Sequence, residues 1–205
     1  MKSIAFLSQK GGSGKTTLAV HTTVAAQEAQ EKVFLIDTDP QKSATIWSEA
    51  REAATPVVVT IAAGELEKVL TAGSEDGMSL AIVDTAPHTA PDAARIAKLV
   101  DLVVIPCRPT AFDLAAVSNA VEIVRAAKKK AVLVLSACPF RSPEISETRA
   151  VLEEYGLPVC PFDITDRRAF ARAVATGRAV TEFEAEGKAA QEIQTLWKWL
   201  KEQIQ

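Results

Sequence analysis

The feature that most constrains this chain is a glycine-rich segment near its beginning. The segment reads Gln-Lys-Gly-Gly-Ser-Gly-Lys-Thr-Thr over residues 9–17, and it follows a short apolar run at residues 4–7. An alanine-rich stretch without proline or glycine continues from residue 18. Glycines let backbone N–H groups approach phosphate oxygens with no Cβ in the way, and a helix that starts here points its positive end at the same phosphates. Strand, glycine loop and helix in this order therefore predict a phosphate-binding loop.

Two side chains of this loop have predicted roles toward a nucleoside triphosphate. We expect Lys15 to reach the β- and γ-phosphates and the Thr16 hydroxyl to bind Mg²⁺. The residues predicted to bind the nucleotide are Lys10, Gly11, Gly12, Ser13, Gly14, Lys15, Thr16 and Thr17. The alternative is a glycine-rich turn that binds nothing. Two lysines and two threonines around three glycines disfavour that alternative.

Short apolar runs alternate with helical patterns along the rest of the chain. The predicted strands cover residues 4–7, 33–36, 57–61, 80–83, 102–105 and 132–135. The predicted helices cover residues 15–29, 44–53, 65–72, 92–99, 115–127 and 189–204. This order indicates an α/β fold with a mostly parallel, twisted sheet and helices on both faces. No linker, repeat or change of composition marks a boundary, so residues 1–205 are expected to form one domain.

Composition excludes several classes of protein. The net charge is −3, so any contact with nucleic acid requires a local basic patch. The three cysteines are far apart and odd in number, which fits neither a disulfide framework nor a metal site, and we expect them to be buried in a reducing compartment. The glycine loop leaves no room for a signal peptide, and no apolar run is long enough to span a bilayer. We therefore expect a cytoplasmic protein.

Three further stretches carry polar residues directly after predicted strands. They are residues 37–41 (Asp-Thr-Asp-Pro-Gln), 84–87 (Asp-Thr-Ala-Pro) and 105–114, which includes a Pro-x-x-Pro sequence and Asp113. Ligands of parallel sheets bind at the carboxyl ends of the strands, so the three stretches and the glycine loop should form one site. Asp84 has the position of the carboxylate that holds Mg²⁺ through water in phosphate-loop ATPases. A polar turn or a helix cap is the simpler alternative for the first and third stretches, and an exposed loop position is favoured for His88.

The glycine loop departs from the common phosphate-loop pattern in an informative way. Gln9 stands where that pattern has glycine, and an extra lysine, Lys10, begins the loop. The resulting K-G-G-x-G-K-T-T sequence resembles the deviant Walker A loop of the ParA/MinD ATPases, which are P-loop NTPases of the SIMIBI type. The resemblance covers most of the chain, is strongest over residues 4–114, and is closest to the short ParF-like ParA proteins that lack a separate N-terminal DNA-binding domain. It implies that the ligands are ATP and Mg²⁺.

The resemblance also implies roles for individual residues. Lys10, Lys15 and Asp39 would be catalytic, with Lys10 reaching the partner's nucleotide in an ATP-dependent homodimer and Asp39 orienting the attacking water. Thr16, Asp37 and Asp84 would hold Mg²⁺, the carboxylates through water. The residues expected in switch loops or at the dimer interface are Lys10, Pro40, Gln41, Thr85, Pro87, Pro106, Pro109 and Asp113.

A basic segment follows in the last third of the chain. Arg167, Arg168, Arg172 and Arg178 are predicted to form a patch for DNA phosphates, with residues 128–130 as a further lysine cluster. Such binding would be independent of sequence and sensitive to salt. A solvated helix with local ion pairs to Asp166, Glu182 and Glu184 is the alternative. By resemblance, the protein would be a weak, nucleoid-associated ATPase that segregates plasmid or other cargo and is stimulated by a centromere-binding adaptor of the ParB or ParG kind.

Two stretches are candidates for the region that would bind the base. Relatives often carry asparagine where this chain has residues 136–139 (Ser-Ala-Cys-Pro), and residues 160–164 are a second candidate for the wall around the base. The choice of ATP over other nucleotides therefore rests on the resemblance alone.

Two other functions remain as alternatives. A MinD-like protein that cycles on membranes would use the last helix, whose apolar stripe comprises Ile193, Leu196, Trp197, Leu200 and Ile204. Glu192 and Glu202 dilute its basic face, which favours docking on the protein core over membrane binding. A small-molecule enzyme related to dethiobiotin synthetase would need substrate-binding groups that the sequence does not reveal. A nitrogenase-type iron–sulfur reductase is disfavoured because no cysteine follows Asp84 at a suitable loop position.

Overall fold

A six-stranded parallel sheet lies at the centre of the protein. A computed structural model describes residues 1–87 and 90–205, so His88 lies outside the described residues. The strands are β1 (Lys2–Phe6), β2 (Val33–Asp37), β3 (Val57–Thr60), β4 (Leu80–Asp84), β5 (Leu102–Cys107) and β6 (Lys130–Leu135). Their order across the sheet is β3-β2-β4-β1-β5-β6, and each described pair is parallel. The six predicted strands are confirmed, with ends shifted by one or two residues.

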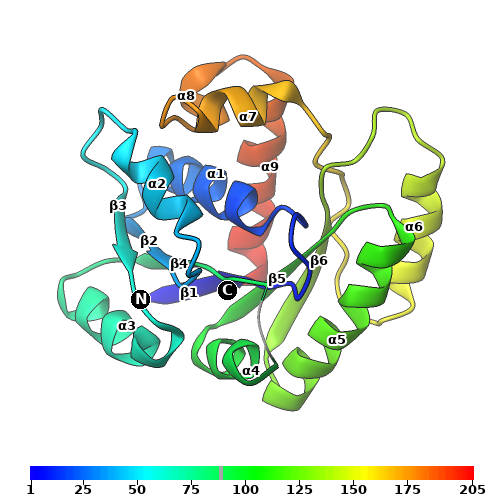
Figure 1. The fold of residues 1–205 in the computed structure, drawn as a ribbon, viewed down its shortest axis with the longest axis horizontal. Helices are drawn as coiled ribbons and strands as arrows, with labels where there is room; N and C mark the ends of the chain where they lie inside the picture. The colour runs from blue at the N-terminus through cyan, green and yellow to red at the C-terminus, as the bar shows by residue number, and fades with distance from the viewer. Residues whose placement is uncertain (88–89) are drawn as a thin grey trace.

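Helices cover both faces of this sheet (Figure 1). One face packs against α1 (Lys15–Glu28), α2 (Ser43–Glu49), α7 (Arg168–Val174), α8 (Val180–Phe183) and α9 (Lys188–Gln203). The other packs against α3 (Leu66–Glu75), α4 (Ala90–Leu99), α5 (Ala111–Ala127) and α6 (Glu144–Glu153), and a short 3-10 turn, η1 (Ala63–Glu65), precedes α3. In β1, Ile4 and Phe6 belong to the first core, and Ala5 lies in the second. This alternation follows from the two-residue period of a strand, and it explains why the central strands are apolar on both sides.

Several helix boundaries differ from the prediction. The helix expected at residues 44–53 ends at Glu49, where Arg51 turns to donate to the Gly177 carbonyl. The helix expected from residue 115 starts at Ala111, because the Thr110 side chain caps it by accepting from the Asp113 N–H at 3.2 Å. Helix α6 was not predicted. It buries only Thr148 and Leu152, so it has almost no apolar stripe to recognise.

The last helix docks on the protein core, as favoured from its charge pattern. Ile193, Leu196, Trp197 and Leu200 are buried in the first core, and Trp199 packs against it partly buried. The apolar stripe is therefore occupied in this structure. Within the described part of the chain, no helix combines the length and the apolar character that crossing a membrane requires.

The three cysteines are free and buried, as predicted. Burial raises the pKa of the Cys107 thiol to about 12, and that of Cys160 to about 11. These thiols therefore act as small apolar side chains of the core.

Candidate nucleotide-binding site

The glycine loop joins β1 to α1 at the carboxyl edge of the sheet. Gly14 has a left-handed backbone (φ 97°) and begins α1, whose first N–H groups lack intrahelical partners. Gly12 is also left-handed (φ 77°), and a Cβ on Gly11 or Gly12 would meet nothing within 4 Å. The first turn of α1 has no acidic residue. The loop therefore leaves open space beside a helix amino terminus, which suits an anion of the size of a phosphate group.

The two lysines of the loop lie in different surroundings. Lys15 is buried, and its ammonium donates to the Lys10 carbonyl at 3.1 Å. Burial lowers the pKa of Lys15, and the charges of Asp84 and Asp39 offset part of that effect. The Lys10 side chain is 35% exposed, and its ammonium pairs with the Asp113 carboxylate. Lys15 thus lies inside the loop, whereas Lys10 extends from it toward the start of α5.

Two predicted metal-site carboxylates lie side by side because the strand register pairs them. Asp37 at the end of β2 is opposite Asp84 at the end of β4, and Asp84 is also opposite Phe6 of β1. The Asp37 carboxylate accepts from the Asp39 N–H at 3.0 Å and from the Thr45 N–H and hydroxyl at 2.9 and 2.8 Å. Asp37 therefore holds the following loop and the start of α2 in place.

Asp84 differs from Asp37 because no hydrogen bond satisfies its carboxylate. It is fully buried, and neither of its oxygens has hydrogen-bond geometry with another described residue. Burial raises the pKa of Asp84 to about 7, and the charge of Asp37 adds to this, while Thr16 and Lys15 lower the pKa. A buried carboxylate with free lone pairs is a suitable site for a cation.

These residues fit the Mg²⁺ that the glycine loop implies. Among the described residues, no group of three or more His, Cys, Asp or Glu side chains is arranged as a metal cage. Mg²⁺ in phosphate sites needs few protein ligands, since waters and phosphate oxygens complete its shell. Thr16 and Asp84 would hold the ion, which supplies charge neutralisation at the phosphates.

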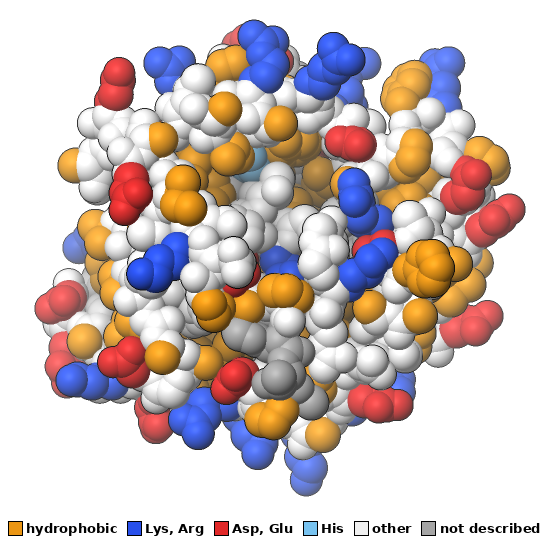
Figure 2. All heavy atoms as spheres, in the orientation of Figure 1, with side chains coloured by type: hydrophobic (Ala, Val, Ile, Leu, Met, Phe, Trp, Pro, Cys, Tyr) orange, Lys and Arg blue, Asp and Glu red, His pale blue; other side chains and the backbone are white. Residues whose placement is uncertain are grey.

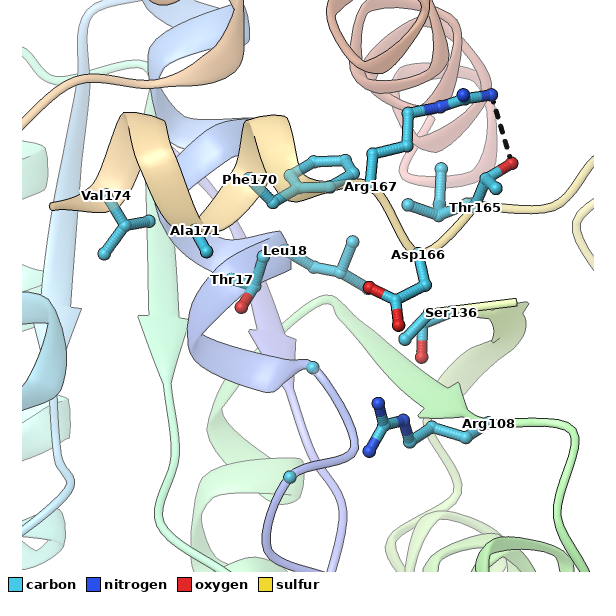
Figure 3. Close-up of a pocket in the computed structure, with 14 residues that line it drawn as sticks. Thr17, Leu18, Arg108, Ser136, Thr165, Asp166, Arg167, Phe170, Ala171 and Val174 are labelled. Atoms are coloured by element: carbon cyan, nitrogen blue, oxygen red, sulfur yellow. Dashed lines mark hydrogen bonds between the residues drawn. The ribbon is translucent and has the colours of Figure 1, made fainter. Parts of the chain in front are cut away.

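A pocket of about 280 Å³ opens beside the glycine loop (Figure 3). Its lining comprises Gly12, Gly14, Thr17, Leu18, Arg108, Ser136, Ala137, Ile164, Thr165, Asp166, Arg167, Phe170, Ala171 and Val174. Glycines lie at one end and apolar side chains of α7 at the other, which is the polarity that a nucleotide presents. Ser136 and Ile164 belong to the two stretches predicted to surround the base. No role in the pocket was predicted for Phe170 or Arg108, although Arg108 lies in the stretch 105–114 and Phe170 lies among the arginines of the basic segment.

Ser136 holds the loop in place from the end of β6. Its hydroxyl donates to the Ser13 carbonyl at 2.8 Å, and its backbone N–H donates to the Cys107 carbonyl at 2.9 Å. Ser136, which begins one of the two stretches predicted to surround the base, therefore tethers the glycine loop.

The predicted arginine patch is divided by the structure. The Arg167 guanidinium pairs with Glu192 at 2.6 Å and lines the pocket, so Arg167 is committed within the protein. Arg168 and Arg178 are exposed, and Arg172 lies 4.0 Å from Glu184. Figure 2 shows Lys and Arg side chains along the edge of the molecule over α7 and α8. The lysines at residues 128–130 are separate, because they lie between the end of α5 and the first residue of β6, at the amino-terminal edge of the sheet.

Of the local ion pairs considered in the sequence, the one to Glu184 is present, with Arg172 at 4.0 Å, and the other two differ. Glu182 is bound by Arg51, with nitrogen–oxygen distances of 2.9 and 2.7 Å, and not by the arginines of the predicted patch. Arg167 pairs with Glu192 of α9 instead of Asp166. The two pairs join different elements, across 131 and 25 residues of sequence.

The residues predicted for switch loops and a dimer interface fall into two groups. Pro40, Gln41 and Pro87 are exposed, and Pro109 is half-buried. Thr85, Pro106 and Asp113 are buried, since Thr85 donates to the Phe6 carbonyl, Pro106 lies inside β5 and Asp113 lies in the first turn of α5. The buried residues add no exposed surface in the monomer, and Pro106 lies inside β5 and not in the loop that follows it. The catalytic, metal and interface roles stay predictions.

Comparisons with known proteins agree with this geometry. The family model described as "CobQ/CobB/MinD/ParA nucleotide binding domain" matches residues 4–180. The "Maintenance of carboxysome distribution protein A" of Gloeobacter kilaueensis is 33% identical over 98% of this chain and 93% of its own length. "Protein ParA" of Rhizobium radiobacter is 26% identical over 83% of this chain and 81% of its own. The structure of a Cyanothece McdA variant in complex with ATP has a TM-score of 0.82 with 17% identity, covering 100% of this chain and 96% of that one.

Proposed function

Because the chain belongs to the CobQ/CobB/MinD/ParA family of nucleotide-binding proteins and is an ATPase that uses ATP and Mg²⁺, we propose that it is a positioning ATPase of the ParA type. Two protomers would bind ATP face to face, and the dimer would bind DNA without sequence preference. The dimer would segregate plasmid DNA or another cargo through a centromere-binding adaptor of the ParB or ParG kind. That adaptor would stimulate weak ATP hydrolysis and so release the dimer.

The position of Lys10 is the observation that carries this proposal. One buried lysine, Lys15, already serves the loop of its own protomer. Lys10 instead reaches outward to the start of α5, where its ammonium lies 5.9 Å from the ring centroid of the exposed Phe112. A second lysine in this position is available to a nucleotide on a facing protomer. Breaking its pair with Asp113 would then be part of dimer formation.

The remaining roles follow from the arrangement at the strand ends. Asp39 lies on the loop that Asp37 anchors, near enough to Lys15 for its charge to act on the lysine pKa. In the proposed reaction, Asp39 orients a water for in-line attack on the γ-phosphate. Lys15 and the partner's copy of Lys10 neutralise the charge that develops on the phosphate oxygens.

The proposed DNA surface lies on α7 and the loop that follows it. Arg168, Arg172 and Arg178 are exposed there, and Arg172 is held only by a 4.0 Å contact with Glu184. A dimer would present two such patches to one duplex, so affinity would rise without a new contact. This arrangement makes DNA binding depend on ATP.

A large protein assembly is a second candidate for the cargo. The relative from Gloeobacter kilaueensis, which spans nearly the whole chain, is named for the distribution of carboxysomes, whereas the Rhizobium relative is named ParA. Distribution of a large protein assembly over DNA would use the same dimer and the same arginines. Only the adaptor would differ.

Fluorescence anisotropy with a labelled duplex of arbitrary sequence tests the proposal. The wild-type protein should bind the duplex with ATP and Mg²⁺ but not with ADP or without nucleotide, and binding should fall steeply between low and moderate salt. Lys10→Ala should abolish the binding to the duplex that the wild type shows with ATP. The double variant Arg168→Ala/Arg172→Ala should lose DNA binding but still dimerise with ATP, as measured by analytical ultracentrifugation.

Two outcomes would contradict the proposal. If the protein binds ATP but stays monomeric and ignores DNA at every salt concentration, the partition role is wrong. If DNA binding is equal with ATP, ADP and no nucleotide, the arginines form a basic surface that the nucleotide does not control.

A further inference from the structure

Arg108 lies where the β5–α5 loop meets the pocket beside the glycine loop. Two contacts fix its backbone carbonyl, which accepts from the Thr110 N–H at 2.7 Å and from the Cys107 thiol at 3.3 Å. Its half-buried side chain lines the same pocket as Gly12 and Gly14. Figure 3 shows the side chain extending from the end of β5 toward the glycine loop.

The guanidinium of Arg108 has no partner within the described part of the protein. No hydrogen bond or ion pair joins it to another described residue, whereas Arg167, which lines the same pocket, is bound by Glu192. Asp166 lies across the pocket without pairing with Arg108. A guanidinium carries five donors and stays charged at every physiological pH. A half-buried arginine in a pocket with its donors free is suited to a ligand that carries several acceptor oxygens.

The position of Arg108 in the pocket indicates which part of the ligand this side chain contacts. The apolar end is formed by Phe170 and Val174 of α7, while the Arg108 side chain extends toward the glycine loop. In phosphate loops, the backbone at the loop and at the helix start surrounds the α- and β-phosphates, and the loop lysine reaches the β- and γ-phosphates. We propose that Arg108 binds the α- and β-phosphates of the nucleotide in its own protomer. This inference rests on ATP binding at the glycine loop and not on the proposed DNA or cargo function.

Thermal unfolding with and without nucleotide tests the role of Arg108. Because Arg108 has no described partner in the protein, Arg108→Ala should leave the Tm without nucleotide unchanged within about 1 °C. Loss of a charge-assisted hydrogen bond should weaken ATP and ADP binding by about tenfold or more, measured by isothermal titration calorimetry in Mg²⁺. The rise in Tm caused by saturating nucleotide should shrink accordingly. Arg108→Lys should recover part of the affinity, since it keeps the charge but loses the two-pronged geometry.

Arg95→Ala is the matched control, because Arg95 is an exposed arginine of α4 outside this pocket. It should bind both nucleotides as the wild type does. Equal ATP and ADP affinities in Arg108→Ala and wild type would overturn the inference, even if DNA binding proceeds as proposed. A loss confined to ATP, with ADP unaffected, would also overturn it, because the contact would then involve the γ-phosphate or the facing protomer. If the wild type binds neither nucleotide, this inference and the proposed function both fail.

Discussion

The ammonium of Lys10 pairs with the buried carboxylate of Asp113, across 103 residues of sequence. The same carboxylate oxygen accepts from the Thr110 hydroxyl at 2.5 Å, so the cap of α5 and the glycine loop share one acceptor. The other oxygen of Asp113 is buried without a partner among the described residues. Lys10 therefore also connects the glycine loop after β1 to the start of α5 in the monomer.

The ion pair between Lys10 and Asp113 should contribute to the free energy of unfolding of the protein without nucleotide. Lys10→Ala should lower the free energy of unfolding by about 1–2 kcal/mol, because it leaves a buried carboxylate without its charged partner. Asp113→Asn should cost less, and Lys10→Ala added to Asp113→Asn should cost almost nothing further. Urea unfolding of the four proteins in this cycle measures the coupling. Strictly additive costs would show that the pair contributes nothing.

Replacing Asp84 should stabilise the protein without ligands. The folded pKa of about 7 lies above the ordinary aspartate value of 3.8, with Asp37, Asp39 and Lys15 as the charged groups that act on it. Stability from this group is therefore fully present below about pH 4 and is lost as pH rises through about 7. At pH 8, Asp84→Asn should raise the free energy of unfolding by on the order of 3 kcal/mol, and the gain should shrink toward pH 5.

The same variant should lose its response to Mg²⁺. In the wild type, adding Mg²⁺ to ATP should increase the Tm, and chelation with EDTA should reverse that increase. Asp84→Asn should show the same Tm with ATP alone as with ATP and Mg²⁺. A full Mg²⁺ response in the variant would remove Asp84 from the proposed metal site.

His21 should make the protein sensitive to mild acid. The imidazole is fully buried on α1, accepts from the Val180 N–H at 3.1 Å, and has its pKa lowered to about 3 by burial, with the charge of Glu182 offsetting a part. A lowered pKa contributes stability above pH 6.5 that is lost as pH falls, at about 1.4 kcal/mol per pH unit. His21→Asn keeps an acceptor for Val180 but cannot titrate. Its free energy of unfolding should fall less than that of the wild type between pH 7 and pH 5, and parallel curves would contradict the assignment.

Two glycines with similar backbones should respond differently to alanine. Gly177 (φ +66°) faces α2, where an added Cβ would lie 2.3 Å from the Ala50 carbonyl oxygen. Gly77 (φ +76°) has nothing within 4 Å. Gly77→Ala should cost about 1–2 kcal/mol, because only the left-handed backbone is strained. Gly177→Ala should cost at least about 2 kcal/mol more, or prevent folding, since a backbone carbonyl has to move. Thermal unfolding distinguishes the two variants. Similar Tm values would show that the backbone at the end of α2 can move at little cost in free energy.

The sequence by itself determined the architecture and the position of the phosphate loop. Strands such as Val33–Asp37 are buried on both faces, so their uninterrupted apolar runs indicate a parallel sheet covered on two sides. The glycine loop is equally local, because its function depends on neighbouring residues. Helix α6 escaped prediction because it buries too few side chains to form a stripe.

Only the tertiary structure decided which side chains meet. Lys10 meets Asp113, Arg51 meets Glu182, and Arg167 meets Glu192, although the first two pairs are more than 100 residues apart. Charged residues far apart in sequence carry no periodic signal, since their partners depend on how loops from different strands converge at one edge of the sheet. For the same reason, Arg108 could be found within a motif of the sequence, but its place in the pocket could not be predicted. The chemistry of the loop is local, and its surroundings are a product of the fold.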